Sequence, residues 1–281
     1  MEQLVFDRQQ ALPEEVYCAV LPPLYPAFAA LEQLRSKDLV QRRRAADQLA
    51  TLAATQPLGR LAAARLEQIA AAEPDSLVWR SILTAVANDP SEPSIRLAYA
   101  AIGHPSPEIR RRACEHLVAH PAPQHVKVLL PVLKDESHSV VCAAVRAIGL
   151  SGRPEDAEPL RRLSATTSEQ LQLDTAVALA RLGDSAAPGA LERLTYSKDP
   201  LVVRQAALMM GELGDPAFTP ALVRLLDSPM TVCRAALDSL PKVAGRDVAE
   251  ADGQPAANSS DRIRRWKQWY EQAQGGWTKR R

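Results

Sequence analysis

Residues 199–215 read DPLVVRQAALMMGELGD, and this stretch decides the fold because its pattern returns every 31 residues. Each copy opens on a polar residue, continues with an apolar pair and small residues, and closes on Leu or Gly. Self-similarity at this period is typical of a stacked array, in which each unit buries its apolar face against its neighbours. Clear copies begin at Ser168, Ser137, Ser106 and Asp75, and looser ones at Pro229 and Asp38.

The stretch at 199–215 itself predicts one helix. Val203, Ala206 and Met210 recur at helical spacing and form an apolar stripe. Asp199 before a proline is a typical N-cap, and Gly214 stands where a helix end accepts a left-handed residue. The sequence therefore marks both ends of this second helix of the repeat.

A shorter first helix precedes each second helix and carries apolar pairs three residues apart, such as Leu191 and Leu194. The chain is 46% hydrophobic but only 4% aromatic. A core of Ala, Leu, Val and Ile suits close-packed helices better than strands. The sequence thus predicts an all-α fold, a right-handed α-solenoid of about seven helical hairpins.

Composition divides the 281 residues into four parts. Residues 1–26 are proline-rich and are expected to form a lead-in that caps the first hairpin. The repeats cover 27–244, and 245–260 have the composition of a flexible linker. Residues 261–281 are expected to form a basic, aromatic capping helix and tail.

Charge and cysteines narrow the classes of function. A formal charge of +1 creates no global field for nucleic acid or an anionic membrane. We interpret the scattered cysteines as free thiols of a reducing compartment. The sequence shows neither a signal peptide nor an apolar run long enough to span a bilayer, so we expect a cytoplasmic protein. The four cysteines are Cys18, Cys114, Cys142 and Cys233.

The pattern Asp-Pro-x-Val-Val-Arg-x-Ala-Ala with a closing Leu-Gly-Asp, at residues 199–215, resembles HEAT repeats. The resemblance covers residues 27–244 and is to the short kind shared with phycobilisome-lyase-type bacterial proteins. It implies a binding scaffold, because HEAT arrays serve mainly in this way and the fold hosts several unrelated tasks. The principal hypothesis is therefore a non-enzymatic scaffold that binds a protein or peptide on its concave face.

The resemblance also brings enzymatic alternatives. Deoxyhypusine hydroxylases of this type hold two irons with His-Glu dipeptides, and the sequence contains none. DNA glycosylases of this type need a basic surface rich in aromatic residues, which the repeats lack. A phycobilin-lyase-like or other ligand-handling role stays open as an alternative, although no lyase motif is matched.

One repeat position predicts where a partner would bind. The residue five places after each repeat start is Arg in five of seven copies, including Arg204, and points away from the core stripe. These guanidiniums either pair with acidic groups of neighbouring repeats or line a groove for an acidic peptide. In the middle copies the position is apolar, which predicts either an exposed apolar patch or residues covered by neighbouring helices. The candidate partner-binding residues are Arg111, Cys142, Arg146, Leu173, Val177, Arg181, Leu201, Arg204 and Leu208.

Two arginine runs and one histidine pair are further candidate binding sites. The arginine runs 42–44 and 110–112 are expected to be solvated, since successive helical residues point about 100° apart. His116 and His120 lie one turn apart, a spacing that can hold a metal, but Cys114 occupies a core position. We predict no metal, no cofactor and no catalytic residue.

The C-terminal segment has seven basic and two acidic residues and three of the four tryptophans. Its aromatic side either caps the last hairpin or docks on another protein, RNA or an anionic surface. Nucleic-acid or anionic-surface binding through this tail is the second alternative function. The candidate residues are Arg262, Arg264, Arg265, Trp266, Lys267, Trp269 and Tyr270.

Overall fold

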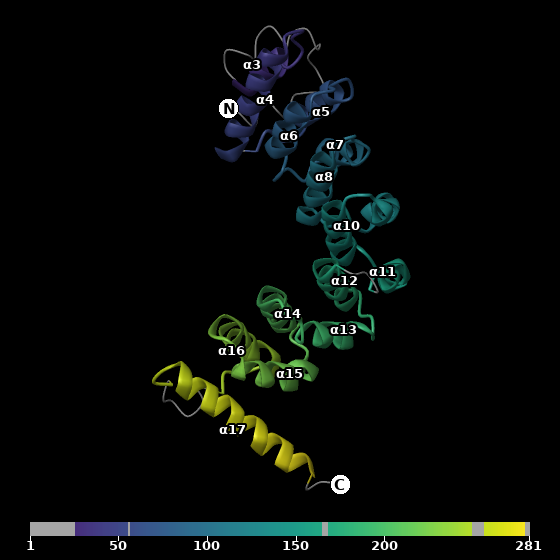
Figure 1. Ribbon diagram of the computed structural model, residues 1–281. Coiled ribbons are helices and arrows are strands. Elements are labelled where there is room, and N and C mark those ends of the chain that lie inside the picture. Colours follow the sequence, from purple (N-terminus) through teal and green to yellow (C-terminus); the bar gives the residue numbers. More distant parts are fainter. Residues whose placement is uncertain (1–25, 56, 165–167, 249–255, 279–281) are drawn as a thin grey trace. The chain divides into compact units, whose positions relative to one another are not determined.

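The computed structural model describes residues 26–55, 57–164, 168–248 and 256–278 (Figure 1). Over these ranges all regular structure is helical and no β-strand occurs. The predicted all-α class is confirmed. The chain divides into two compact units, Met1–Ala147 and Ile148–Arg281.

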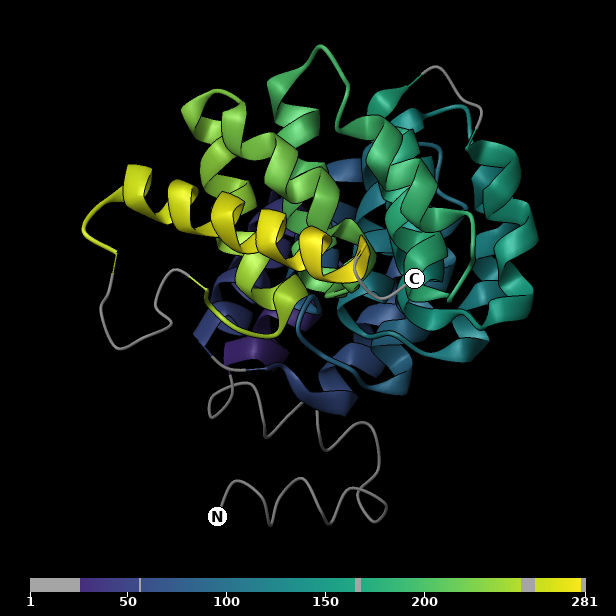
Figure 2. The same cartoon turned by 90° about the horizontal axis from the view of Figure 1, so that it is seen from below.

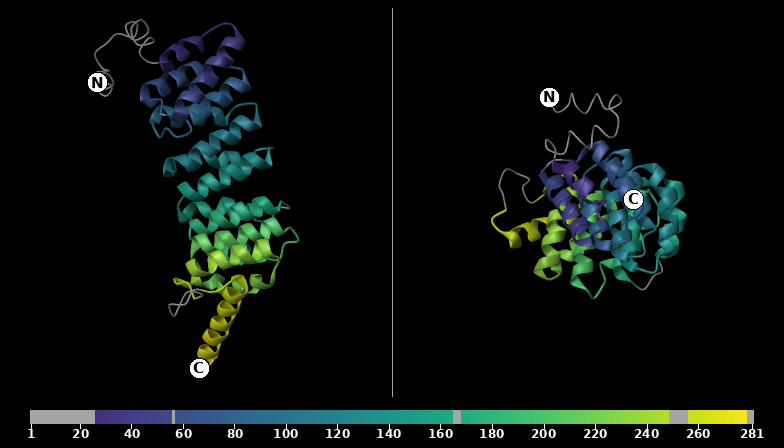
Figure 3. Two further views of the ribbon diagram at one scale, coloured as in Figure 1. Left: turned by 90° about the vertical axis from the view of Figure 1, so that its left-hand side faces the viewer. Right: turned by 90° about the horizontal axis from the view of Figure 1, so that it is seen from above.

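The first unit is built from hairpins of short and longer helices. The first helices, α3, α5 and α7, contact one another in order, and so do the second helices, α4, α6 and α8. Each hairpin thus stacks on the next in two layers, as Figure 3 shows. The helices are α3 (Pro26–Gln33), α4 (Leu39–Thr55), α5 (Gly59–Ala70), α6 (Ser76–Ala85), α7 (Glu92–Ile102), α8 (Pro107–Ala119), the 3-10 turn η1 (Pro123–His125), α9 (Val126–Leu129), η2 (Leu130–Lys134) and the start of α10 (His138–Ser151).

The second unit repeats this arrangement. Its second helices α12, α14 and α16 contact one another in order, while α11, α13 and α15 each pack on the second helix of the same hairpin. The helices are the end of α10, η3 (Pro154–Asp156), α11 (Ala157–Leu163), α12 (Glu169–Arg181), α13 (Ala187–Leu194), α14 (Pro200–Leu213), η4 (Pro216–Phe218), α15 (Thr219–Arg224), η5 (Leu225–Asp227), α16 (Met230–Ala244) and α17 (Ser259–Thr278).

The described helices from α3 to α16 pair into seven hairpins, as the repeat predicts. Local chemistry sets their ends. The Asp199 carboxylate accepts from the backbone N–H of Leu201 at 2.8 Å, and Pro200 starts α14. Gly214 ends α14 with φ of 66°, a conformation that costs glycine nothing.

First helices are broken where proline interrupts the backbone ladder. Pro131 sits at the start of η2, so the helix that begins at Val126 continues beyond Leu129 only as a 3-10 turn. The second helices of the repeats keep their length of thirteen to fourteen residues in α8, α12 and α14. The prediction of a shorter first helix is wrong in one hairpin, since α6 has ten residues and α5 before it has twelve.

Small residues let second helices approach closely in the second unit. A Cβ placed on Gly211 of α14 would lie 2.6 Å from the Cβ of Ser239 on α16. Gly149 meets Ala178 of α12 in the same way, at 2.6 Å between Cβ positions. This spacing seals the apolar core of the unit, in which Leu173, Val202 and Ala206 are buried.

The predicted outer segments are only partly described. Residues 1–25 of the expected lead-in and 249–255 of the expected linker lie outside the described residues. Helix α17 begins at Ser259, two residues before the predicted start. In the described part of the chain, every helix is too short or too polar to cross a bilayer.

Candidate functional site

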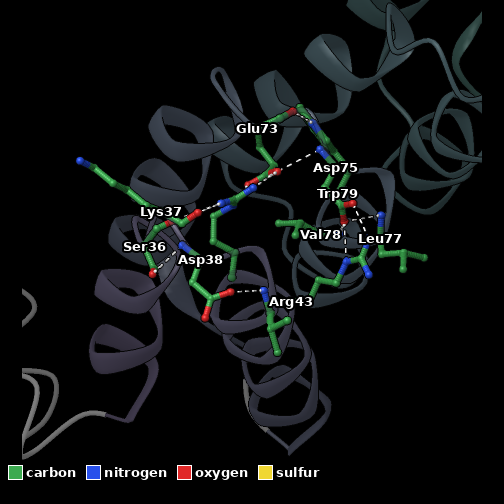
Figure 4. Close-up of polar contacts among 11 residues, drawn as sticks. Ser36, Lys37, Asp38, Arg43, Glu73, Asp75, Leu77, Val78 and Trp79 are labelled. Carbon is green, nitrogen blue, oxygen red and sulfur yellow. Dashed lines mark hydrogen bonds and ion pairs between the residues drawn. The ribbon is translucent and has the colours of Figure 1, made fainter.

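The second-helix position five residues after each repeat start behaves differently in different repeats. In the first unit Arg43 of α4 reaches the next repeat and donates to both carboxylate oxygens of Asp75, at 3.2 and 2.7 Å (Figure 4). Its hydrogen bonds lower the pKa of Asp75, which also accepts from the backbone N–H of Val78. Asp75 is thus a helix cap and an ion-pair partner at once.

Other arginines at this position lack such a partner. Arg111 pairs with Glu115 on its own helix α8. The side chains of Arg80, Arg204 and Arg234 make no hydrogen bond or ion pair with any residue in the described ranges. The predicted ladder between repeats therefore holds at Arg43 and is incomplete elsewhere.

The middle repeats do not expose an apolar patch, which was one of the two alternatives that the sequence allowed. Cys142 of α10, in the first unit, is 8% exposed. In the second unit Leu173 and Val177 of α12 are 3% and 7% exposed and belong to the core cluster. The expectation of an exposed patch is wrong, because all three residues are buried. In the second unit α12 packs on α14, and Leu173 and Val177 share its core cluster, so cover by a neighbouring helix, the other alternative, holds there.

The remaining candidates of the second unit are accessible to different degrees. Leu201 at the start of α14 is 66% exposed, and Arg204 one turn later is exposed. Leu208 is half-buried against the core. Arg181, at the C-terminal end of α12, lies 3.9 Å from the carboxylate of Glu212, which is near the C-terminal end of α14. Leu201 and Arg204 thus share an accessible surface.

In the first unit Arg111 and Arg146 are half-buried. Exposed apolar side chains stand instead at Val40 of α4 and Leu77 of α6, at 53% and 41%. Both occupy the repeat position of Leu201, two residues after the helix cap. That shared position is the signal from which sequence analysis could have found them.

The sequence also missed two exposed residues of the second unit. Tyr196, in the turn before α14, is 65% exposed, and Met230, at the start of α16, is 61% exposed. The Arg224 guanidinium lies 3.8 Å from the centre of the Tyr196 ring. Their places outside the apolar stripe of the repeat gave no helical pattern to follow.

The first arginine of each arginine run is a structural residue. Arg42 donates to Glu73 at 2.8 Å and to the carbonyls of Ser36 and Lys37 at 3.1 and 3.2 Å, while Glu73 accepts from the backbone N–H of Asp75. Figure 4 shows this network joining two consecutive repeats. The expectation that these runs are only solvated is wrong at Arg42 and Arg110, because the backbone before α4 and before α8 offers carbonyl oxygens to each guanidinium.

A buried histidine cluster occupies the contact between α6 and α8. His116 is 4% exposed, and neither of its ring nitrogens has a hydrogen-bond partner among the described residues. Its ring centre lies 4.7 Å from that of His120, whose Nε2 is 3.0 Å from the carbonyl oxygen of Ala87. Burial, together with the charge of His120, lowers the pKa of His116 to about 4. Nearby, His125 is bonded to the hydroxyl of Tyr99 at 2.6 Å.

Metal binding finds no support in this cluster. Over the described ranges no group of three or more His, Cys, Asp and Glu side chains is arranged to hold an ion. Burial raises the pKa of the Cys114 thiol to about 12, so the sulfur stays protonated and packs as an apolar group.

Helix α17 is anchored by one tryptophan. Trp266 is fully buried in the core of the second unit, and Trp269 meets it edge to face with ring centres 5.4 Å apart. Ile263 and Tyr270 pack partly against the same core. Figures 1 and 2 both show α17 beside α15, which it contacts.

The predicted basic residues of α17 are paired with acids of their own unit. Arg262 lies 3.5 Å from Asp247, and Lys267 pairs with Asp227. Arg264 and Arg265 both pair with Asp261. The geometry fits the predicted cap, with much of the positive charge already balanced.

Comparisons with known proteins agree with this architecture. The family model of HEAT repeats matches residues 95–177 and 162–241. None of the curated proteins matches the sequence.

Among solved structures, the complex of CpcE and CpcF of phycocyanin lyase from Nostoc sp. PCC7120 is similar, with 15% identity, 85% of this chain and 92% of that chain covered, and a TM-score of 0.56. The YibA protein of Escherichia coli shares 16% identity over 85% of this chain and 96% of its own, with a TM-score of 0.54. An engineered protein shares 18% identity over 92% of this chain and 75% of its own, with a TM-score of 0.51. These likenesses concern the fold alone. With the family model matching more than half of the sequence, and with seven helical hairpins in the described residues, the chain belongs to the HEAT-repeat family.

Proposed function

We propose that this protein is a non-enzymatic scaffold that binds a protein or peptide partner on its second helices. The observation that carries the proposal is the exposure of Val40, Leu77 and Leu201 at one repeat position on these helices. A lone exposed apolar residue needs no explanation, but recurrence at one register suggests a surface kept apolar for contact. Arg80 and Arg204, one turn after Leu77 and Leu201, supply polar anchors of the kind enriched at interfaces, whereas Arg43 is already bound to Asp75.

The test is site-specific photo-crosslinking in the native host. A benzophenone amino acid replaces Leu77 or Leu201 on second helices, and exposed Arg60 or Arg193 on first helices serve as matched controls. We expect a discrete protein adduct from the second-helix positions and a much weaker one from the controls. Equal labelling from both layers, or none from either, would refute the proposal.

A ligand-handling role is the competing function. Phycocyanin lyase shares only the fold at this identity. The protein purified from its native host is expected to show no visible absorbance band. A chromophore bound at one equivalent would overturn the scaffold proposal in favour of this alternative.

Binding through the C-terminal helix is the other alternative. Because Arg262 and Lys267 already pair with Asp247 and Asp227, their charges are less available to phosphates. The variant R264Q/R265Q removes two positive charges from α17 and keeps the buried Trp266. We expect it to bind heparin and RNA as strongly as the parent protein. A large loss of retention would assign the binding to the tail.

A further inference from the structure

The second unit carries a surface band at the N-terminal ends of α14 and α16. Three large apolar side chains lie there, each more than 60% exposed: Tyr196, Leu201 and Met230. The two helices pack directly on each other, so their equivalent ends are neighbours. Together with Arg204 and Arg234, these residues are called the α14–α16 band.

The band contains two arginines that have no acidic partner among the described residues. Arg204 follows Leu201 by three residues and Arg234 follows Met230 by four, so each arginine shares a helix side with an apolar residue. Both side chains are exposed, and neither has an ion-pair partner within the described ranges. At the same repeat position in the first unit, Arg43 is bound by both oxygens of Asp75. The guanidinium N–H groups of Arg204 and Arg234 therefore have no carboxylate acceptor among the described residues and are free to bind one from a partner.

Two acidic groups near the band are engaged elsewhere, and a third is exposed. Asp199 caps α14 through the N–H of Leu201, and Asp227 pairs with Lys267 of α17. Asp238, one turn after Arg234, is exposed and makes no ion pair with it. The N-terminal ends of both helices add partial positive charge.

Tyr196 is held in place as an anchor. The Arg224 guanidinium covers one side of its ring at 3.8 Å, and the same guanidinium donates to the Thr195 hydroxyl. The ring therefore loses little conformational freedom when its outer side is covered by a ligand. Tyrosine, methionine and arginine are the residue types enriched at protein interfaces.

From these contacts we infer that the α14–α16 band binds an acidic peptide segment whose carboxylates alternate with large apolar side chains. The inference rests on the proposed scaffold function and names the partner's chemistry. The carboxylates pair with Arg204 and Arg234, and the apolar side chains cover Leu201, Met230 and Tyr196. A nucleic-acid strand fits less well, because its phosphates would match the two arginines but leave the aliphatic surface wet.

A random 12-residue phage-displayed peptide library, selected on the intact chain, tests the band. We expect the enriched peptides to carry net negative charge and at least two large apolar residues. The best one, made synthetically, should bind R204E/R234E at least about tenfold more weakly, which corresponds to about 1.4 kcal/mol. L201S/M230S should weaken it by a similar factor, and both variants change exposed residues that do not hold the fold. The matched control R153E/R162E makes the same charge change at exposed arginines of the same unit outside the band and should leave the affinity unchanged.

Several results would overturn the inference. Enriched peptides that are neutral or basic, affinity that survives R204E/R234E, or an equal loss in R153E/R162E would each do so, as would the absence of any enrichment. A single-stranded RNA oligonucleotide bound more tightly than the best peptide would assign the band to nucleic acid instead. If the crosslinking at Leu77 succeeds while the band fails here, the scaffold function stands and only the surface is misplaced.

Discussion

Arg110 of α8 binds Asp135, 25 residues later, through two parallel hydrogen bonds of 2.7 and 2.9 Å. Its remaining nitrogen donates to the carbonyls of His104 and Pro105, at 3.0 and 2.8 Å. Asp135 in turn accepts from the backbone N–H of Ser137, at the start of α10. One guanidinium thus fixes the entry to its own helix and the entry to the next second helix, as Arg42 does earlier in the same unit.

Replacing Arg110 with methionine is expected to lower the free energy of unfolding of the first unit by about 2 kcal/mol. The change keeps much of the stem but leaves Asp135, which is 10% exposed, without its cation. Urea unfolding followed by circular dichroism measures the loss. The control R112M removes an arginine that pairs with Glu108 one turn away on the same helix, and should cost less than about 1 kcal/mol.

The same pair has an acid signature. Hydrogen bonds from Arg110 lower the pKa of Asp135 below its usual 3.8. Its contribution to stability is therefore present above that value and is lost as the pH falls through the lowered pKa. In R110M this component of the acid unfolding curve should vanish. An unchanged curve would mean that the pair does not stabilise the unit.

The buried His116 side chain predicts a second dependence of stability on pH, in a less acidic range than that of Asp135. Its pKa is lowered from 6.5 to about 4 by burial, so between these values the unfolded chain binds more protons than the folded one. Stability should fall by about 3 kcal/mol as the pH drops through this window. His120, Asp89 and His125 face the same ring, and the pKa of His125 is lowered in the same direction by its own burial.

The variant H116L should flatten most of that slope, because it removes the buried imidazole. The control H138Q changes an exposed histidine on α10 and should leave the slope as it is. Urea midpoints measured from pH 4 to pH 7 distinguish the two. A slope retained in H116L would contradict the assignment to His116.

Gly211 and Gly189 form a matched pair of helical glycines in the second unit. An alanine at 211 would place its Cβ 2.8 Å from the Cα of Ser239, so α14 and α16 must move apart. We expect G211A to destabilise the unit by about 1–3 kcal/mol. An alanine at 189 meets only the end of Arg193 at 3.8 Å and should stabilise α13 by about 0.5–1 kcal/mol. Thermal unfolding of the two variants should shift in opposite directions.

The burial of Trp266 indicates how strongly α17 is held against the core of the second unit. Its side chain is fully buried, so W266A is expected to cost about 3–5 kcal/mol and to free α17 from the core. Hydrogen exchange over 259–273 should then rise well before global unfolding. The control Q268A alters an exposed residue of the same helix and should change neither quantity. Protection that persists in W266A would show that α17 is held by its ion pairs instead.

Much of the fold is written locally in the chain. The caps at Asp199 and Gly214 act over one or two turns, and the 31-residue period is a property of the chain itself, so the sequence predicts both without knowledge of distant contacts. For the same reason the number of hairpins and the all-α class are read correctly from the pattern. The break after Leu129, where Pro131 begins a 3-10 turn, was not predicted.

The candidate site depended on contacts that no local pattern contains. Cys142, Leu173 and Leu201 lie on one helical side of their repeats, yet the first two are buried and the third is exposed. A position's exposure depends on how closely the next second helix approaches, and this is set by pairs such as Gly211 with Ser239. The same holds for charge, since Arg43 finds Asp75 across a repeat boundary while Arg204 finds no such partner among the described residues.

The sequence by itself therefore determined the repeat, its helices and their ends, because capping and apolar periodicity are short-range effects. Only the tertiary structure decided which side chains of the second helices meet solvent, which arginines are neutralised, and that Trp266 closes the core of the second unit. Burial and ion pairing depend on distances between segments that are far apart in the chain, and packing alone fixes those distances.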